Sequence, residues 1–79
     1  MNYKDRIIRQ QNFCGGEPVF KGTRVTLRTV LSSLAHGDTA ETILAAFPTL
    51  MAEDIQAAIS FAAASAEEDL PVPEVPNIR

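Results

Sequence analysis

The 79-residue sequence contains one cysteine, one histidine and no tryptophan. Cys14 cannot form a disulfide within the chain, because no second cysteine exists. One cysteine and one histidine also predict no metal site, and nucleophilic catalysis needs a base beside the nucleophile. His36, the single histidine, has no catalytic motif around it, and a role at a helix end is favoured over catalysis or metal binding. We therefore expect a protein that is not an enzyme and holds no cofactor.

Long apolar stretches are also missing. No stretch approaches the roughly 18 residues of a membrane span, and no apolar run follows the first residues as in a signal peptide. We expect a cytoplasmic protein that does not contact a membrane, where a lone reduced cysteine is common. A domain of this size buries only about 60% of its unfolded surface, so an oligomer or a bound partner is the expected source of further stability.

Basic residues are nearly absent from the second part of the chain. Residues 1–28 hold six Lys and Arg against two acids, whereas residues 29–79 hold one Arg against eight acids. The net charge of −3 hides this asymmetry. Either the two parts have different partners, or they neutralise each other within a dimer.

The chain is organised around the stretch from Gly15 to Thr26, which places turn signals on both sides of Val19-Phe20. Its glycines predict a tight hairpin, since glycine adopts positive φ without a Cβ clash. Residues 6–13 contain the pair Ile7-Ile8 and predict an edge strand that pairs with Val19-Phe20.

Three helices are predicted after this stretch. Thr26 and Thr39 are suitable N-caps for the first two, and Gly37 and Pro48 are suitable stop signals. The second helix should end at about Ala46, and the third should cover about residues 52–66. The expected fold is therefore mainly α, with an N-terminal β-hairpin or strand pair and a three-helix, helix-turn-helix-like bundle.

The third helix is apolar nearly all round. Its predicted core stripe consists of Ile55, Ala58, Ile59 and Ala62. A second face should pack on another subunit and form a homodimer, because a small core cannot cover both sides. The alternative is an Ala-rich helix with one exposed Phe. The predicted dimer interface comprises Ala57, Ser60, Phe61 and Ala64.

Several of these residues carry a resemblance to a known family. The series Gly16-x-Pro18-Val19-x-x-Gly22-Thr23-Arg24-Val25, then Gly37, Phe47-Pro48, Leu50 and Glu53-Asp54-Ile55, resembles domain of unknown function 433. The resemblance covers roughly residues 5–66. It implies a helix-turn-helix-like core and an antitoxin-like role beside a PIN-like nuclease toxin. Family members usually have Thr at the position of Met51, so the third helix should fray at its start or be capped by Thr49.

The domain is expected to cover residues 1–69, and residues 70–79 form a proline-rich tail. The tail is either a strap that orders on a partner or a frayed end. Arg79 is the one basic group in the second part of the chain. If the toxin is a PIN-like nuclease, we expect Arg79 to contact its acidic metal site.

Double-stranded DNA is a further expected partner. The third helix opens with Glu53-Asp54 and contains no Lys or Arg, which argues against the usual reading of bases by this helix. Arg24 has a structural alternative, a bidentate bond to a carboxylate such as Asp54. Two other functions stay open, a stand-alone DNA-binding regulator and a pure interaction module. The predicted DNA contacts are Lys4, Arg6, Arg9, Lys21, Arg24 and Arg28.

Overall fold

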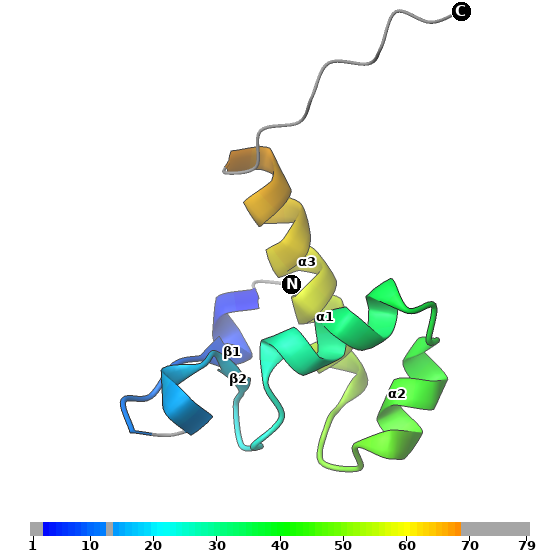
Figure 1. Ribbon diagram of the computed structural model, residues 1–79, viewed down its shortest axis with the longest axis horizontal. Helices are drawn as coiled ribbons and strands as arrows, with labels where there is room; N and C mark the ends of the chain where they lie inside the picture. The colour runs from blue at the N-terminus through cyan, green and yellow to red at the C-terminus, as the bar shows by residue number, and fades with distance from the viewer. Residues whose placement is uncertain (1–2, 13, 69–79) are drawn as a thin grey trace, which may run out of the picture.

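A computed structural model describes residues 3–12 and 14–68. A two-stranded antiparallel sheet is followed by three helices, which confirms the predicted fold class (Figure 1). The elements are η1 (Tyr3–Asp5), β1 (Ile7–Ile8), η2 (Cys14–Gly16), β2 (Val19–Phe20), α1 (Leu27–Ala35), α2 (Ala40–Ala46) and α3 (Ala52–Glu68). The predicted tail, residues 70–79 with Arg79, lies outside the described residues.

The two strands pair as predicted, with Ile7 opposite Phe20 and Ile8 opposite Val19. The predicted extent of the first strand was wrong, because β1 covers two residues instead of 6–13. Asn12 has φ 66° and Cys14 has φ 51°, and an extended strand cannot continue through such values. The short helix η2 then precedes β2.

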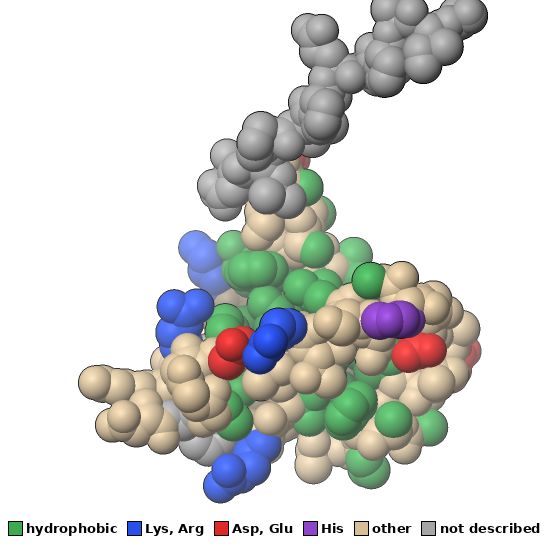
Figure 2. Space-filling view, viewed as in Figure 1, with side chains coloured by type: hydrophobic (Ala, Val, Ile, Leu, Met, Phe, Trp, Pro, Cys, Tyr) green, Lys and Arg blue, Asp and Glu red, His purple; other side chains and the backbone are tan. Residues whose placement is uncertain are grey.

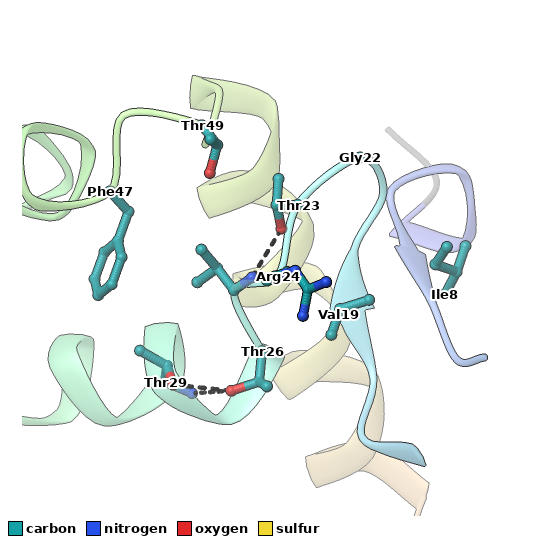
Figure 3. Close-up of a pocket in the computed structure, with 10 residues that line it drawn as sticks. Ile8, Val19, Gly22, Thr23, Arg24, Thr26, Thr29, Phe47 and Thr49 are labelled. Carbon is teal, nitrogen blue, oxygen red and sulfur yellow. Dashed lines mark hydrogen bonds between the residues drawn. The ribbon is translucent and has the colours of Figure 1, made fainter. Parts of the chain in front are cut away.

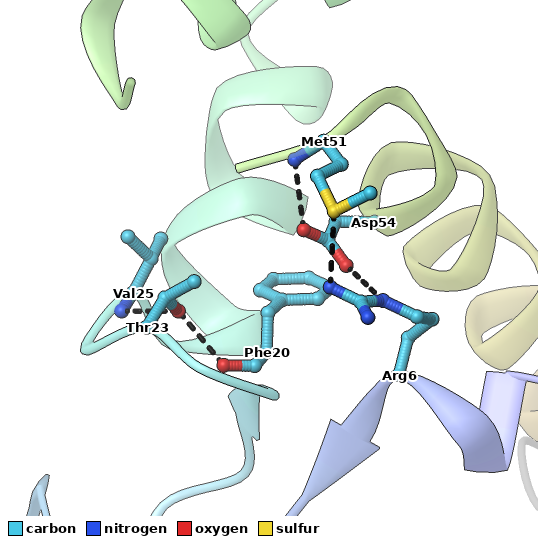
Figure 4. Close-up of polar contacts among 6 residues, drawn as sticks. All are labelled: Arg6, Phe20, Thr23, Val25, Met51 and Asp54. Carbon is cyan, nitrogen blue, oxygen red and sulfur yellow. Dashed lines mark hydrogen bonds and ion pairs between the residues drawn. The ribbon is translucent and has the colours of Figure 1, made fainter. Parts of the chain in front are cut away.

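The tight turn forms at Gly22, which has φ 80°. The backbone N–H of Thr23 donates to the Phe20 carbonyl at 2.9 Å. The buried Thr23 hydroxyl also donates to this carbonyl, at 2.8 Å, and accepts from the Val25 N–H at 3.0 Å (Figure 4). Thr23 therefore closes a turn.

The first two helices begin and end close to the predicted residues. Thr26 and Thr39 are their N-caps, and each side chain accepts a backbone N–H at 3.1 Å. Gly37 follows α1 with φ 94°, and α2 ends at Ala46 before Phe47-Pro48. His36 is the C-cap of α1, with Nδ1 2.8 Å from the Ser32 carbonyl oxygen.

The core lies where β2, α1 and α2 meet the first turns of α3 (Figure 1). Phe20, Val30 and Ile43 are its most fully buried large apolar side chains. Leu31 and Leu34 pack against it from α1. Its members are Phe20, Leu27, Val30, Ile43, Leu50, Ile55 and Ala58.

The orientation of α3 differs from the prediction. Ala57, predicted at a dimer interface, is 0% exposed within the single chain, whereas Ile59, predicted in the core, is 45% exposed. Ala62 is also exposed. The reason is that η1 packs on α3, where the Tyr3 and Phe61 rings meet edge to face with centroids 5.4 Å apart. The chain's own N-terminal segment thus packs on the side of α3 that carries Phe61, while Ser60, Phe61 and Ala64 of the predicted interface are half-buried.

Candidate functional site

An ion pair links Arg6, the residue immediately before β1, to the start of α3. The Arg6 Nε donates to Asp54 Oδ1 at 2.7 Å, and the Asp54 side chain is completely buried while that of Arg6 is 23% exposed (Figure 4). This bond, the largest cause, raises the pKa of Arg6 above its ordinary value, against the opposing effect of burial. Arg6 therefore stays charged throughout the working pH range.

The second oxygen of Asp54 caps α3. Asp54 Oδ2 accepts the Met51 backbone N–H at 2.9 Å, so an acid in the first turn reaches back to the residue before the helix. The helix begins at Ala52, and Asp54 holds the Met51 N–H, a different contact from the first-turn N–H that a threonine in place of Met51 would accept. The Met51 sulfur also lies 3.7 Å from Arg6 Nη2.

These contacts change the expected roles of two arginines. The carboxylate suggested as a structural partner of Arg24 is bonded to Arg6, a predicted DNA contact. Spacing alone did not reveal this pair, because 48 positions separate its members. The one available signal was an acid at the third position of a helix that lacks a hydroxyl cap.

The other five predicted DNA contacts are exposed. Arg28 lies 3.3 Å from Glu17, but its side chain is 75% exposed, and such pairs contribute little. On the face in Figure 2, basic side chains gather on the side of the strands, while the histidine and an acid lie at the other end. The exposed basic residues are Lys4, Arg9, Lys21, Arg24 and Arg28.

A shallow hollow of about 590 Å³ lies between the turn at Gly22 and the loop after α2. Figure 3 shows Phe47 and Thr49 of that loop opposite Arg24 and Thr26. Its described lining combines one guanidinium with threonine hydroxyls and apolar side chains, and contains no carboxylate, imidazole or thiol. The hydroxyls of Thr23, Thr26 and Thr29 are already hydrogen-bonded within the chain, and the described lining offers no acid–base pair for catalysis.

The outward side of α3 is an uncharged apolar face. Met51 precedes it with 48% exposure, and Ile59 projects from its middle with 45% exposure. At about 100° per residue, one third of the helix circumference contains the buried core residue Ile55 and, beside it, the set Ala52, Ile59, Ala62, Ala63 and Ala66. We call this set the outer face of α3, and all its members are exposed.

Among the described residues, two further kinds of feature are absent. No group of three or more His, Cys, Asp or Glu side chains there is arranged to hold a metal ion. None of the described helices has the length and apolar character needed to cross a membrane.

Residues 7–62 match the model of a family described as a protein of unknown function, DUF433. An uncharacterised protein, y4eO of Sinorhizobium fredii (strain NBRC 101917 / NGR234), is 37% identical over 62 residues, which is 78% of this chain and 28% of that protein. The crystal structure of a DUF433 member protein from Anabaena variabilis ATCC 29413 superposes with a TM-score of 0.71 at 28% identity. That alignment covers 82% of this chain and 64% of the solved one.

Proposed function

Because the chain belongs to the DUF433 family, we propose that it is a cytoplasmic antitoxin-like binding protein rather than an enzyme, and that it neutralises a PIN-like nuclease toxin. The antitoxin role comes from the family resemblance of the sequence. The observation that carries a binding role is the outer face of α3, an exposed surface without charge on the longest helix. Exposed apolar side chains gathered on one side of a helix are a common feature of interaction sites.

The proposed partner of this outer face is a second copy of the chain. Alanine side chains allow two helices to approach closely, and Ile59 supplies a large apolar group at the centre. The absence of charge from the outer face lets two identical copies meet without like-charge repulsion. This homodimer retains the predicted helix and uses the face opposite Ala57 and Phe61.

The proposed contact with the toxin is Arg79. The metal site of a PIN-like nuclease is acidic, and a guanidinium can bind its carboxylates through two parallel hydrogen bonds. The dimer would present two copies of residues 70–79, so two nuclease subunits can be bound at once and avidity adds to the affinity of each contact.

Co-expression with the product of the adjacent gene tests this function. The complex is purified through a tag on this chain, and its mass and composition are measured by native mass spectrometry. A stable complex with a protein that is toxic alone supports the proposal, and a bare dimer beside a harmless neighbour contradicts it. Arg79→Ala should weaken inhibition of the nuclease, while Asn77→Ala, two residues away, should leave it unchanged.

DNA binding is a second candidate, favoured by the exposed basic residues of the N-terminal part. In a helix-turn-helix, the second helix of the pair enters the major groove. Here that helix would be α3, whose first turn exposes Glu53 and has no cation. DNA would therefore be held by phosphate contacts from the strands, the turn and α1, duplicated across the dimer, with Arg6 engaged by Asp54.

The salt dependence of promoter binding tests this candidate. Each phosphate contact contributes a slope of about −0.9 to log K against log salt. Replacing Lys21 and Arg28 by alanine should make the slope shallower by about 2 per protomer. Arg79→Ala, which removes a charge outside the basic part, is the control and should leave the slope unchanged. Binding that ignores salt, or that survives the double replacement intact, contradicts the DNA candidate.

A further inference from the structure

A second hollow of about 400 Å³ lies between α1, α3 and the segment before β2. Leu27, Leu31 and Ala35 follow each other at intervals of four along α1, and Phe61 closes the hollow from α3. Pro18 lines the opposite end. On the face in Figure 2, hydrophobic side chains gather where α3 rises behind α1. We call this hollow the α1–α3 groove.

The sequence beyond α3 has a pattern that matches such a groove. Val72, Val75 and Ile78 recur at every third position, among prolines at 71, 73 and 76. A polyproline II helix has three residues per turn, so these three side chains would form one aliphatic stripe. Polyproline II segments bind in grooves that contain aromatic and apolar side chains, and their preset backbone limits the entropy lost on binding. Glu74 and Asn77 fall on a different stripe.

The length of chain favours docking within the same molecule. Phe61 and the end of α3 at Glu68 are seven residues apart, or about 10 Å along the helix axis. Four residues of polyproline II span about 12 Å, so a chain that reverses after Glu68 brings Val72 level with Phe61. Val75 and Ile78 then follow along the groove, without any need for a second copy.

Charge at the rim is complementary to the same segment. Arg28 lines the groove and is highly exposed, and its contact with Glu17 is a loose one at 3.3 Å. Glu74 lies one residue before Val75 in the sequence and is the acid at the centre of the proline-rich segment. Docking of the aliphatic stripe would bring this carboxylate near Arg28 at the edge of the groove.

We propose that residues 70–79 fold back as a polyproline II segment and dock Val72, Val75 and Ile78 into the α1–α3 groove of their own chain. Arg79 shares a stripe with Pro73 and Pro76, so docking directs it away from the groove. The segment then holds a fixed place on the domain surface. This inference stands apart from the proposed function, since it requires neither a toxin nor DNA.

Backbone ¹⁵N relaxation of the full chain tests the docking. The amides of Val72, Val75 and Ile78 should have order parameters above about 0.6, the upper bound for flexible backbone. Ala35→Lys places a charge in the groove at an exposed position near a helix C-terminus, where a cation suits the dipole. It should lower all three order parameters below about 0.6. Ala45→Lys, at an exposed position on α2 outside the groove, should leave them unchanged.

A pair of variants in the segment gives a second test. Val75→Ser should free the segment and shift the resonances of Leu31 and Phe61, whereas Asn77→Ser should do neither. Low order parameters in the wild-type chain, or values that ignore both Ala35→Lys and Val75→Ser, overturn the proposal. A mixture of labelled and unlabelled chains distinguishes the source of the segment. Filtered NOEs between the Phe61 ring and valine methyls of another chain would show exchange between copies and would also overturn it.

Discussion

The two faces of α3 are both rich in apolar residues, but they have different surroundings. One face, with Asp54, Ala57 and Phe61, is covered by the N-terminal segment. The outer face, centred on Ile59 and Ala62, is exposed. Tyr3 and Arg6 make the difference, because they supply an aromatic ring and a guanidinium for the first face. Which side of an apolar helix is buried thus depends on which other segment of the chain packs against it. Substitutions on the two faces of α3 should therefore have different effects.

The largest effect is expected from Arg6→Ala. It leaves the buried Asp54 carboxylate without its charged partner, and breaking such a pair costs about 3 kcal/mol of unfolding free energy. Chemical denaturation monitored by circular dichroism measures this loss. Arg9→Ala removes an exposed arginine three residues away and should change the unfolding free energy by less than about 0.5 kcal/mol. Equal losses in the two variants would show that the Arg6–Asp54 bond contributes no stability.

The next effect is expected from a larger side chain at the covered face. Ala57→Leu inserts extra carbon atoms beneath the N-terminal segment and should lower the unfolding free energy by about 2 kcal/mol. The matched change Ala62→Leu, on the outer face, should alter it by less than about 0.5 kcal/mol. Thermal and chemical denaturation of both variants measure the difference. A larger loss for Ala62→Leu than for Ala57→Leu would contradict the burial of Ala57, because it would mean that Ala62 faces the domain.

A smaller effect is expected from the aromatic contact between η1 and α3. A double-mutant cycle of Tyr3→Ala and Phe61→Ala should give a coupling energy of about 1 kcal/mol, because edge-to-face rings attract beyond their buried area. Tyr3→Ala with Ile59→Ala is the control cycle and should give additive losses. Additivity in the first cycle would show that η1 does not hold Phe61.

The smallest effect is expected from alkaline pH. The pKa of Arg6 is raised in the folded state, so its contribution is complete below the unfolded pKa and is lost only as pH rises through the folded one. The difference in unfolding free energy between wild type and Arg6→Ala should therefore stay constant from neutral pH to about pH 10. If this difference in unfolding free energy shrinks between neutral pH and about pH 10, a group other than Arg6 determines how the Arg6–Asp54 pair depends on pH.

Much of the fold was predictable because the deciding signals are local. Thr26 and Thr39 cap the helices that follow them, and Pro48 ends the second helix as predicted. The pairing of Ile7-Ile8 with Val19-Phe20 was also predicted from β-branched and turn residues. Each signal acts over a few residues, so the sequence contains it in full.

The orientation of α3 and the role of Arg6 could not be predicted in the same way. A helix that is apolar nearly all round has no polar side to define which face is buried. For this reason Ile59 was predicted in the core although it is exposed, and Ala57 was predicted at a dimer interface although it is buried within the chain. Arg6 and Asp54 come together only after β1 pairs with β2 and η1 packs on α3. Nothing in the sequence distinguished Arg6, whose partner Asp54 is buried, from the other basic residues of the N-terminal part.

The most direct test of the proposal that the outer face of α3 binds a second copy is the mass of the protein in solution at equilibrium. We predict that sedimentation equilibrium at micromolar concentration gives a dimer for the wild type and a monomer for Ile59→Glu, which puts a charge at the centre of the outer face. Gln56→Glu adds the same charge on α3 beside that face and should remain dimeric. A wild-type mass equal to that of the monomer would contradict the claim that the outer face of α3 binds a second copy.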